Sequence, residues 1–87
     1  MNVTFTPKAL TQYIDWQTED KKTLKKINAL IKDIQRNGLM EGTGNPEVLK
    51  HRKGYSRHID SANRLEYDSD NNGNLVIISC KGHYEDI

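Results

Sequence analysis

The second half of the chain places acidic, basic and aromatic side chains on segments that have the composition of β-strands. A carboxylate, two arginines, a lysine and a histidine are the groups needed for metal-free cleavage of a phosphodiester in RNA. One group accepts a proton from the ribose 2′-hydroxyl, cations neutralise the charge of the phosphorane, and an acid protonates the leaving oxygen. RNA supplies its own nucleophile, so no cofactor is expected. The residues concerned are Glu47, Lys50, His51, Arg57, His58, Arg64, His83 and Tyr84.

Each of these side chains also has an interpretation that involves no chemistry. Glu47 could be a solvent-facing charge at the edge of a sheet. Arg57 and Arg64 could form cross-strand pairs with acids of neighbouring segments, namely Asp60, Glu66 or Asp68. The three histidines could form a metal site, but their spacing matches neither a helical nor a zinc-knuckle pattern. The residue types alone therefore leave both a nucleic-acid-acting surface and a passive surface open.

The elements that must position these residues begin with a short strand and two helices. Residues 2–6 alternate apolar and polar side chains, which favours a strand. Residues 6–17 predict a helix with Thr6 as its cap and Pro7 at its first position. The clearest pattern is a second helix over residues 21–38, which Gly38 is placed to end. Its apolar stripe consists of Leu24, Ile27, Leu30, Ile31 and Ile34.

The opposite face of the second helix is basic and admits two interpretations. It carries Lys22, Lys25, Lys26, Lys32 and Arg36. Only Ala29 and Asp33 interrupt it. Such a face is commonly just solvated. The same lysines would also attract the phosphates of a nucleic acid regardless of its base sequence.

Residues 38–46 contain three glycines and a proline, and they predict a loop between a helical half and a strand half. Four strand-like segments follow, at residues 47–51, 55–59, 64–68 and 74–84. The run LVIIS, residues 75–79, is apolar on both faces and predicts a central strand. The order of elements predicts an α+β fold, with two N-terminal helices on one face of a small, mainly antiparallel twisted sheet. One domain is expected to cover residues 1–87.

The composition excludes several classes of protein. The chain has 87 residues, of which 34% are hydrophobic and 29% charged, and its net charge is +1. It is too apolar and too patterned to be disordered, and its net charge alone does not indicate nucleic-acid binding. No apolar run approaches membrane-spanning length, so no membrane partner is expected. The single cysteine, Cys80, is expected to be a buried core residue, and the reducing cytoplasm is the expected compartment.

Several motifs of the chain together resemble the YoeB toxins of the RelE-like superfamily. They are YIDWQTEDKKTLKKINALIKDIQRN, EGTGNPEVLKH, YSRHI, NRLEY and the terminal GHY. The similarity extends over essentially the whole length without an obvious insertion. It implies a small α+β domain with two helices against a twisted antiparallel sheet, in agreement with the elements predicted above.

The resemblance also implies an activity, that of a ribosome-dependent endoribonuclease that cleaves messenger RNA and inhibits translation as the toxin of a type II toxin–antitoxin pair. Glu47 would be the general base, Arg64 would stabilise the transition state, and His83 would be the general acid. Cleavage through the 2′-hydroxyl would leave a 2′,3′-cyclic phosphate. Contacts with the substrate would come from Lys50, His51, Arg57 and Tyr84.

The partners implied by the resemblance are a YefM-like antitoxin, the ribosome and messenger RNA. Operator DNA would be reached only through the antitoxin complex, and a homodimer is a further option. The alternative is a non-catalytic module of the same fold that binds the antitoxin or RNA without cutting. A passive binder would have no need for a glutamate, an arginine and a histidine together, which favours the enzyme.

The chain departs from the usual pattern of the family at several positions. Tyr55 stands where the family usually has a tryptophan, and His58 stands where it has a second arginine. Asn63 precedes Arg64 in place of a histidine, and a Lys–Gly pair ending at Gly82 replaces an Arg–Tyr pair. These changes lower the number of aromatic rings and permanent cations available to a substrate.

Overall fold

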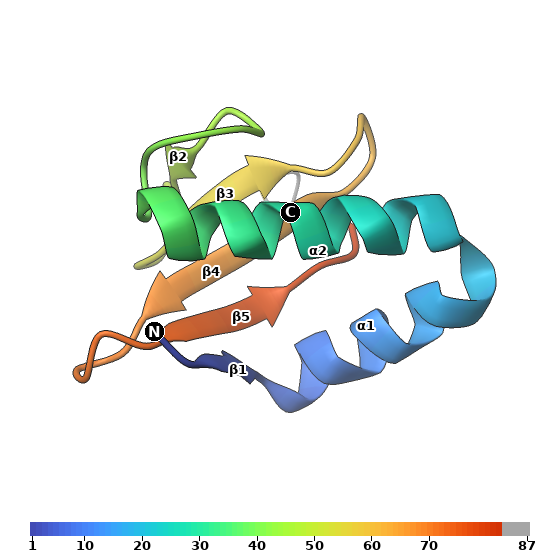
Figure 1. Cartoon of the computed structure of the whole chain (residues 1–87), viewed down its shortest axis with the longest axis horizontal. Coiled ribbons are helices and arrows are strands. Elements are labelled where there is room, and N and C mark those ends of the chain that lie inside the picture. The colour runs from blue at the N-terminus through green and yellow to red at the C-terminus, as the bar shows by residue number, and fades with distance from the viewer. Residues whose placement is uncertain (83–87) are drawn as a thin grey trace.

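The chain forms one five-stranded sheet with two helices on one of its faces (Figure 1). The computed structural model describes residues 1–82, so the predictions for His83 and Tyr84 fall outside the described residues. The strands are β1 (Val3–Phe5), β2 (Glu47–Val48), β3 (Tyr55–His58), β4 (Arg64–Ser69) and β5 (Leu75–Ser79), and the helices are α1 (Pro7–Glu19) and α2 (Lys21–Asn37). The predicted α+β fold is confirmed.

The strands lie in the order β1-β5-β4-β3-β2. Pairing is antiparallel from β2 through β5, whereas β1 runs parallel to β5. The apolar strand β5 has a neighbour on each side, which explains its apolar composition, although the middle strand is β4. Two predicted strands were too long by at least three residues. The first of them ends at Val48, because the Leu49 N–H already bonds to the carbonyl of Gly54 (2.9 Å) and closes a loop, and the last ends at Ser79.

Local side-chain chemistry sets the helix boundaries. Thr6 caps α1 as predicted, since its Oγ1 accepts the Ala9 N–H at 3.1 Å. Asp20 separates the helices and caps α2, accepting the N–H groups of Lys22 (3.0 Å) and Thr23 (3.4 Å). The hydrogen bond from the Thr23 hydroxyl, together with these backbone bonds, lowers the pKa of the Asp20 carboxyl. Gly38, with φ 98°, follows the end of α2.

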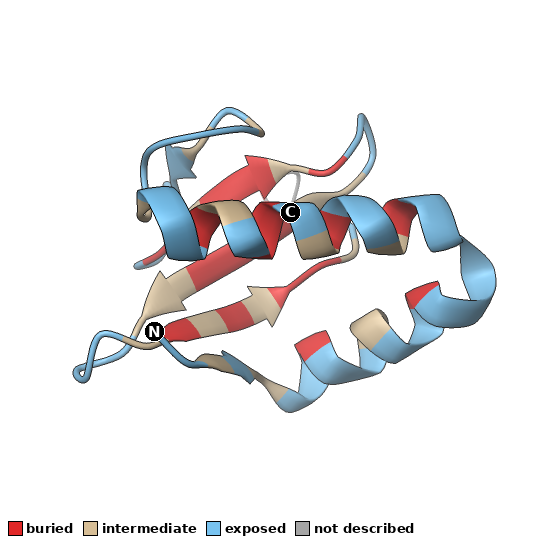
Figure 2. Ribbon diagram, in the orientation of Figure 1, coloured by how far each residue is buried: buried red, intermediate tan, exposed pale blue. Residues whose placement is uncertain are grey.

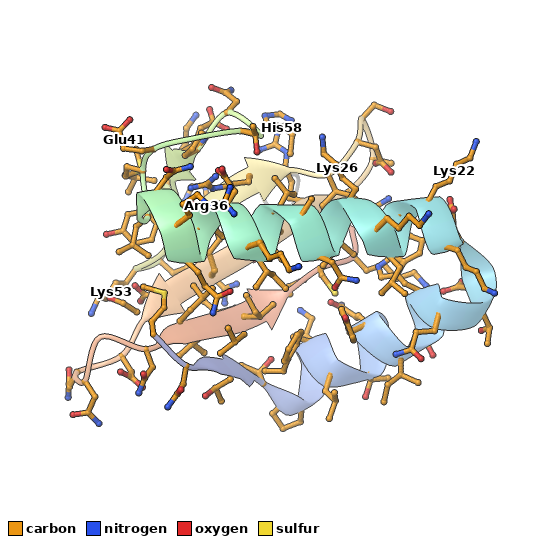
Figure 3. The ribbon with its side chains drawn as sticks, in the orientation of Figure 1. Lys22, Lys26, Arg36, Glu41, Lys53 and His58 are labelled. Atoms are coloured by element: carbon orange, nitrogen blue, oxygen red, sulfur yellow. The ribbon has the colours of Figure 1, made fainter. Side chains whose placement is uncertain are left out.

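The core lies between the apolar stripe of α2 and the sheet (Figure 2). Its fully buried members from these two layers include Ile27, Leu30, Ile34, Leu65, Tyr67, Leu75 and Ile77. Lys22 and Lys26 of α2 lie outside this core and are exposed to solvent (Figure 3). Within residues 1–82, neither helix combines the length and the apolar character that crossing a bilayer requires.

Cys80 is completely buried, as predicted, and its backbone carbonyl accepts the indole N–H of Trp16 at 2.9 Å. Burial raises the pKa of its thiol to about 11. Because the thiolate is the reactive form, a disulfide-exchange reagent should modify the folded protein roughly a hundredfold or more slowly than the urea-unfolded chain at neutral pH. The release of the coloured thiol from such a reagent measures both rates, and equal rates would contradict the burial of this side chain.

Candidate active site

Three polar side chains meet on the face of the sheet that the helices leave uncovered. Leu65 in β4 is buried under the helices, so its neighbour Arg64 points to the opposite face, because side chains alternate along a strand. The register places Arg64 opposite His58 and Glu47 opposite Ser56. His58 and Ser56 are two residues apart in β3 and therefore share a face. Strands β2, β3 and β4 thus each direct one or more polar side chains to this surface.

The carboxylate of Glu47 lies between two basic groups. Its Oε1 atom is 3.3 Å from Nη1 of Arg64 and 3.6 Å from Nε2 of His58. The Glu47 side chain is 48% exposed and the Arg64 side chain only 15%. An exposed carboxylate beside a better-fixed guanidinium can accept a proton from a substrate while the cation stays in place. The structure therefore brings together two of the three residues predicted to be catalytic, and their chemical roles remain predictions.

His58 is the site residue that the sequence analysis did not assign. It was named there among the polar residues of the strand segments and as a departure from the family pattern, but it was given no role. The signal that could have found it is the alternation within residues 55–58, which puts His58 on the face opposite to Arg57. Once Leu65 is assigned to the core, its cross-strand partner Arg57 must follow it, and His58 becomes the partner of Arg64.

Arg57 was predicted to contact the substrate, and its position corrects that prediction. The side chain is completely buried, on the helix side of the sheet. A guanidinium has five N–H donors, and the structure gives partners to all of them. The acceptors are the Tyr67 hydroxyl (2.9 Å), Asp33 Oδ2 (2.5 Å) and the carbonyls of Thr43 (2.9 Å), Gly38 (2.9 Å) and Glu41 (2.6 Å). Arg57 has no donor left for a phosphate in this conformation.

The contacts of Arg57 position the loop that leads to the site. Its three carbonyl partners lie between the end of α2 and β2, in the segment that runs directly into Glu47. Asp33 fixes the same loop from α2 by accepting the Thr43 N–H at 2.9 Å, and this bond is the main reason why the pKa of the Asp33 carboxyl is lowered. Gly42, with φ 111°, lies so close that a Cβ there would collide with Asp33 Oδ2. Arg57 and Asp33 thus support Glu47 from the opposite face of the sheet.

Two further residues that were predicted to contact the substrate lie in the loop between β2 and β3. Lys50 and His51 are both exposed there and lie beyond the end of β2 rather than within a strand. The same loop carries Arg52, which pairs with the buried carboxylate of Glu66 at 2.6 Å. This ion pair ties the loop to β4, while the roles predicted for Lys50 and His51 remain predictions.

The described chain ends beside Arg64. The Gly82 N–H bonds to Oδ1 of Asn63 at 2.8 Å, and the Gly82 carbonyl accepts the Arg64 N–H at 3.0 Å. Lys81 turns the other way, since its Nζ pairs with Glu19 at 2.6 Å and lies 5.0 Å from the centre of the Trp16 ring. Asn63, one of the departures from the family pattern, therefore helps to fasten the end of the described region to β4.

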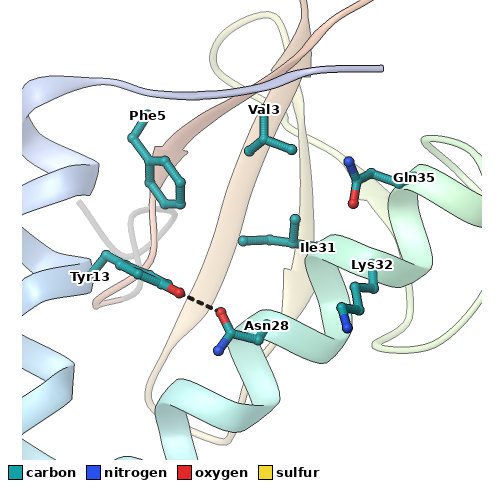
Figure 4. A pocket seen from close by; sticks show the side chains of 7 residues that line it. All are labelled: Val3, Phe5, Tyr13, Asn28, Ile31, Lys32 and Gln35. Atoms are coloured by element: carbon teal, nitrogen blue, oxygen red, sulfur yellow. Dashed lines mark hydrogen bonds between the residues drawn. The ribbon is translucent and has the colours of Figure 1, made fainter.

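A pocket of about 380 Å³ lies on a different part of the molecule, among β1, α1 and α2 (Figure 4). Its lining residues are Val3, Phe5, Tyr13, Asn28, Ile31, Lys32 and Gln35. The Tyr13 hydroxyl donates to Oδ1 of Asn28 at 2.6 Å across one end of the pocket. No predicted site residue lines it, and Lys32 is its one charged side chain, so the pocket lacks the acid–base pair that the sheet face provides.

Comparison with known proteins agrees with this architecture. A family model for the YoeB-like toxin of bacterial type II toxin–antitoxin systems matches residues 5–84. The chain is 46% identical to the toxin YoeB of Synechocystis sp. over 90 residues, which cover 98% of this chain and 99% of that protein. A YoeB dimer from Staphylococcus aureus is similar in structure, with a TM-score of 0.89 at 48% identity over 97% of this chain and 98% of that one.

A heterotetrameric YoeB–YefM toxin–antitoxin complex from Staphylococcus aureus contains a chain with the same fold. Its TM-score is 0.86 at 49% identity, and the match covers 97% of this chain and 98% of that one. The sequence identity and the nearly complete coverage of both aligned chains agree with the match to the family model. The chain therefore belongs to the YoeB-like toxins of bacterial type II toxin–antitoxin systems.

Proposed function

We propose that this toxin is an endoribonuclease that cleaves messenger RNA on the ribosome and thereby stops translation in the cytoplasm. The observation that supports the proposal most directly is the Glu47 carboxylate held between Arg64 and His58 on an open face of the sheet. A proton acceptor beside a cation is the arrangement that attack by a 2′-hydroxyl on the adjacent phosphate requires.

The reaction is a transesterification within the RNA. Glu47 accepts the proton of the 2′-hydroxyl as that oxygen bonds to phosphorus, and Arg64 neutralises the added negative charge. The bond from phosphorus to the 5′-oxygen then breaks, and the leaving oxygen takes a proton from His83. The products are a 2′,3′-cyclic phosphate and a 5′-hydroxyl. The described chain ends beside Arg64, which supports assigning the next residue, His83, to the same reaction.

The open position of the site favours a substrate that is ordered by something other than this protein. The Glu47 side chain is 48% exposed, so a substrate can approach it from solvent. Messenger RNA held in the decoding site of a ribosome has its reacting groups oriented in advance, an effect worth up to roughly 7–11 kcal/mol. Lys50, His51 and Tyr84 are proposed to contact the RNA around the scissile bond, and no cofactor takes part.

The proposed protein partner is a YefM-like antitoxin, as in the Staphylococcus aureus complex. An acidic segment of the antitoxin would compete with the RNA phosphate for Arg64 and for the exposed lysine of the neighbouring loop. Operator DNA would be contacted only through that complex. A homodimer is proposed as well, as in the Staphylococcus aureus dimer.

Cleavage of messenger RNA on programmed ribosomes tests the proposal. The purified toxin should cut ribosome-bound RNA at least about a hundredfold faster than the same free RNA, because the ribosome supplies orientation. Adding a YefM-like antitoxin in excess should suppress the cut. Mapping the 5′ ends of the fragments measures both effects. Equal rates with and without ribosomes would indicate a general ribonuclease, and binding without any cleavage would indicate the non-catalytic alternative.

A further inference from the structure

We propose that His58 is a further catalytic residue, whose protonated imidazole binds a non-bridging oxygen of the scissile phosphate and so supplies a cation that depends on pH. The inference rests on the proposed function. It adds a residue to which the sequence analysis gave no role.

The position of His58 places it within reach of the reacting groups. It is the cross-strand partner of Arg64 and lies on the same open face of the sheet. Its Nε2 atom is 3.6 Å from the Oε1 atom of Glu47, which is the atom that also contacts Arg64. A phosphate whose neighbouring hydroxyl approaches Glu47 would therefore meet both Arg64 and His58.

The backbone of His58 is held by a hydrogen bond, whereas its side chain is accessible to solvent. Its N–H bonds to the carbonyl of Gly44 at 2.7 Å, which joins β3 to the loop that carries Glu47. The imidazole is 38% exposed, so a substrate can approach it from solvent. Within the sheet, His58 is thus held in the same framework as Glu47 while its ring stays accessible.

The imidazole lies between charged groups of opposite sign. Among residues 1–82 these are the carboxylate of Glu47 on β2 and the guanidinium of Arg64 on β4. Asp60, just after β3, is engaged by the N–H groups of Ala62 and Asn63 at 2.8 Å each. A phosphate arriving at the site would add negative charge beside the ring and favour the imidazolium. Histidine side chains generally ionise within roughly pH 5–8, a range in which arginine keeps its charge.

The test compares the wild type with His58→Arg and His58→Gln. Single-turnover cleavage of ribosome-bound RNA is measured at saturating protein from about pH 5.5 to 8.5, a range that brackets histidine ionisation. Every variant uses the same ribosomes, so effects of pH on the ribosome or on other groups cancel in the rate ratios. Gln17→Arg, an exposed position on α1, is the matched control for an added positive charge. Thermal melting at each pH checks that all four proteins are folded.

The rate of His58→Arg relative to the wild type should rise roughly tenfold or more from the acidic to the basic end of the range, as a lost phosphate contact would require. The ratio of the wild-type rate to the His58→Gln rate should fall toward one as the pH rises. Ratios that stay constant with pH while the wild type cleaves would overturn the role of His58 and leave the proposed function intact. Absence of cleavage by every protein at every pH would overturn the proposed function, and this inference with it.

Discussion

Replacing the ribose at the cleavage site with 2′-deoxyribose is expected to abolish cleavage while leaving binding nearly unchanged. The Glu47 carboxylate is placed to accept a proton, and the proposed nucleophile is the hydroxyl that the substitution removes. The proposed contacts with the phosphate and the bases do not involve that hydroxyl. A loss of the attacking group removes the reaction itself, so this is the largest effect expected of any single change.

The measurement uses ribosomes programmed with a messenger that carries one deoxynucleotide at the mapped site. Binding is followed by co-sedimentation of the toxin with the ribosomes, and cleavage by the length of the RNA. Glu47→Gln should lower the rate by about 10²–10⁴-fold on the all-ribose messenger, which is the usual contribution of a positioned base. The glutamine side chain matches that of glutamate in shape and in hydrogen-bonding reach, so the substitution removes only the proton acceptor. Cleavage of the deoxy-substituted messenger at the normal rate would exclude attack by the 2′-hydroxyl.

Replacing Arg57 with methionine is expected to destabilise the protein by about 3–5 kcal/mol, the usual cost of removing one partner from a buried ion pair. The side chain is completely buried, and its loss would remove the cation that pairs with Asp33 and the donors of three loop carbonyls. Small domains have a total stability of roughly 5–15 kcal/mol. Arg57→Met should therefore lose a large part of its stability, and its activity would fall because the loop no longer holds Glu47.

Arg64→Met is the matched control for this experiment. It makes the same change seven positions later in the sequence, on the open face of the sheet, where the side chain is partly exposed. Urea unfolding followed by tryptophan fluorescence should show a large decrease in the midpoint for Arg57→Met and a small one for Arg64→Met. Cleavage should be lost in the Arg64 variant even though it stays folded. Similar midpoints for the two variants would show that the contacts of Arg57 are not needed for stability.

The helical half of the fold could be predicted from the sequence because its determinants are local. Thr6 and Pro7 determine where α1 begins. The Thr6 side chain accepts one of the first free N–H groups of the helix, and Pro7 has no N–H group that needs an acceptor. The apolar stripe of α2 recurs at helical spacing, and this periodicity fixes which side of the helix enters the core. The turn-forming residues and the apolar strand at 75–79 then suffice for an α+β fold with β5 inside the sheet.

Glu47 and Arg64 could be predicted to act together because their residue types and their motifs carry the information, and the structure places them 3.3 Å apart while their roles remain predictions. The face on which each arginine lies could not be assigned in the same way. Alternation along a strand shows only that neighbours point in opposite directions, and a shift of one residue exchanges the two faces. Arg57 and His58 are such neighbours, and the sequence analysis chose Arg57 for the substrate.

The tertiary structure places Arg57 rather than His58 in the interior, because it supplies acceptors for a buried guanidinium. Those acceptors come from distant parts of the chain, including Asp33 on α2, 24 residues away, and the loop after that helix. Burying an arginine is favourable only when its charge and its N–H groups are all satisfied, and no local pattern in residues 55–58 reports such partners. With Arg57 held in the interior, alternation leaves His58 beside Glu47 on the open face, so the composition of the site depends on contacts that form only when the chain has folded.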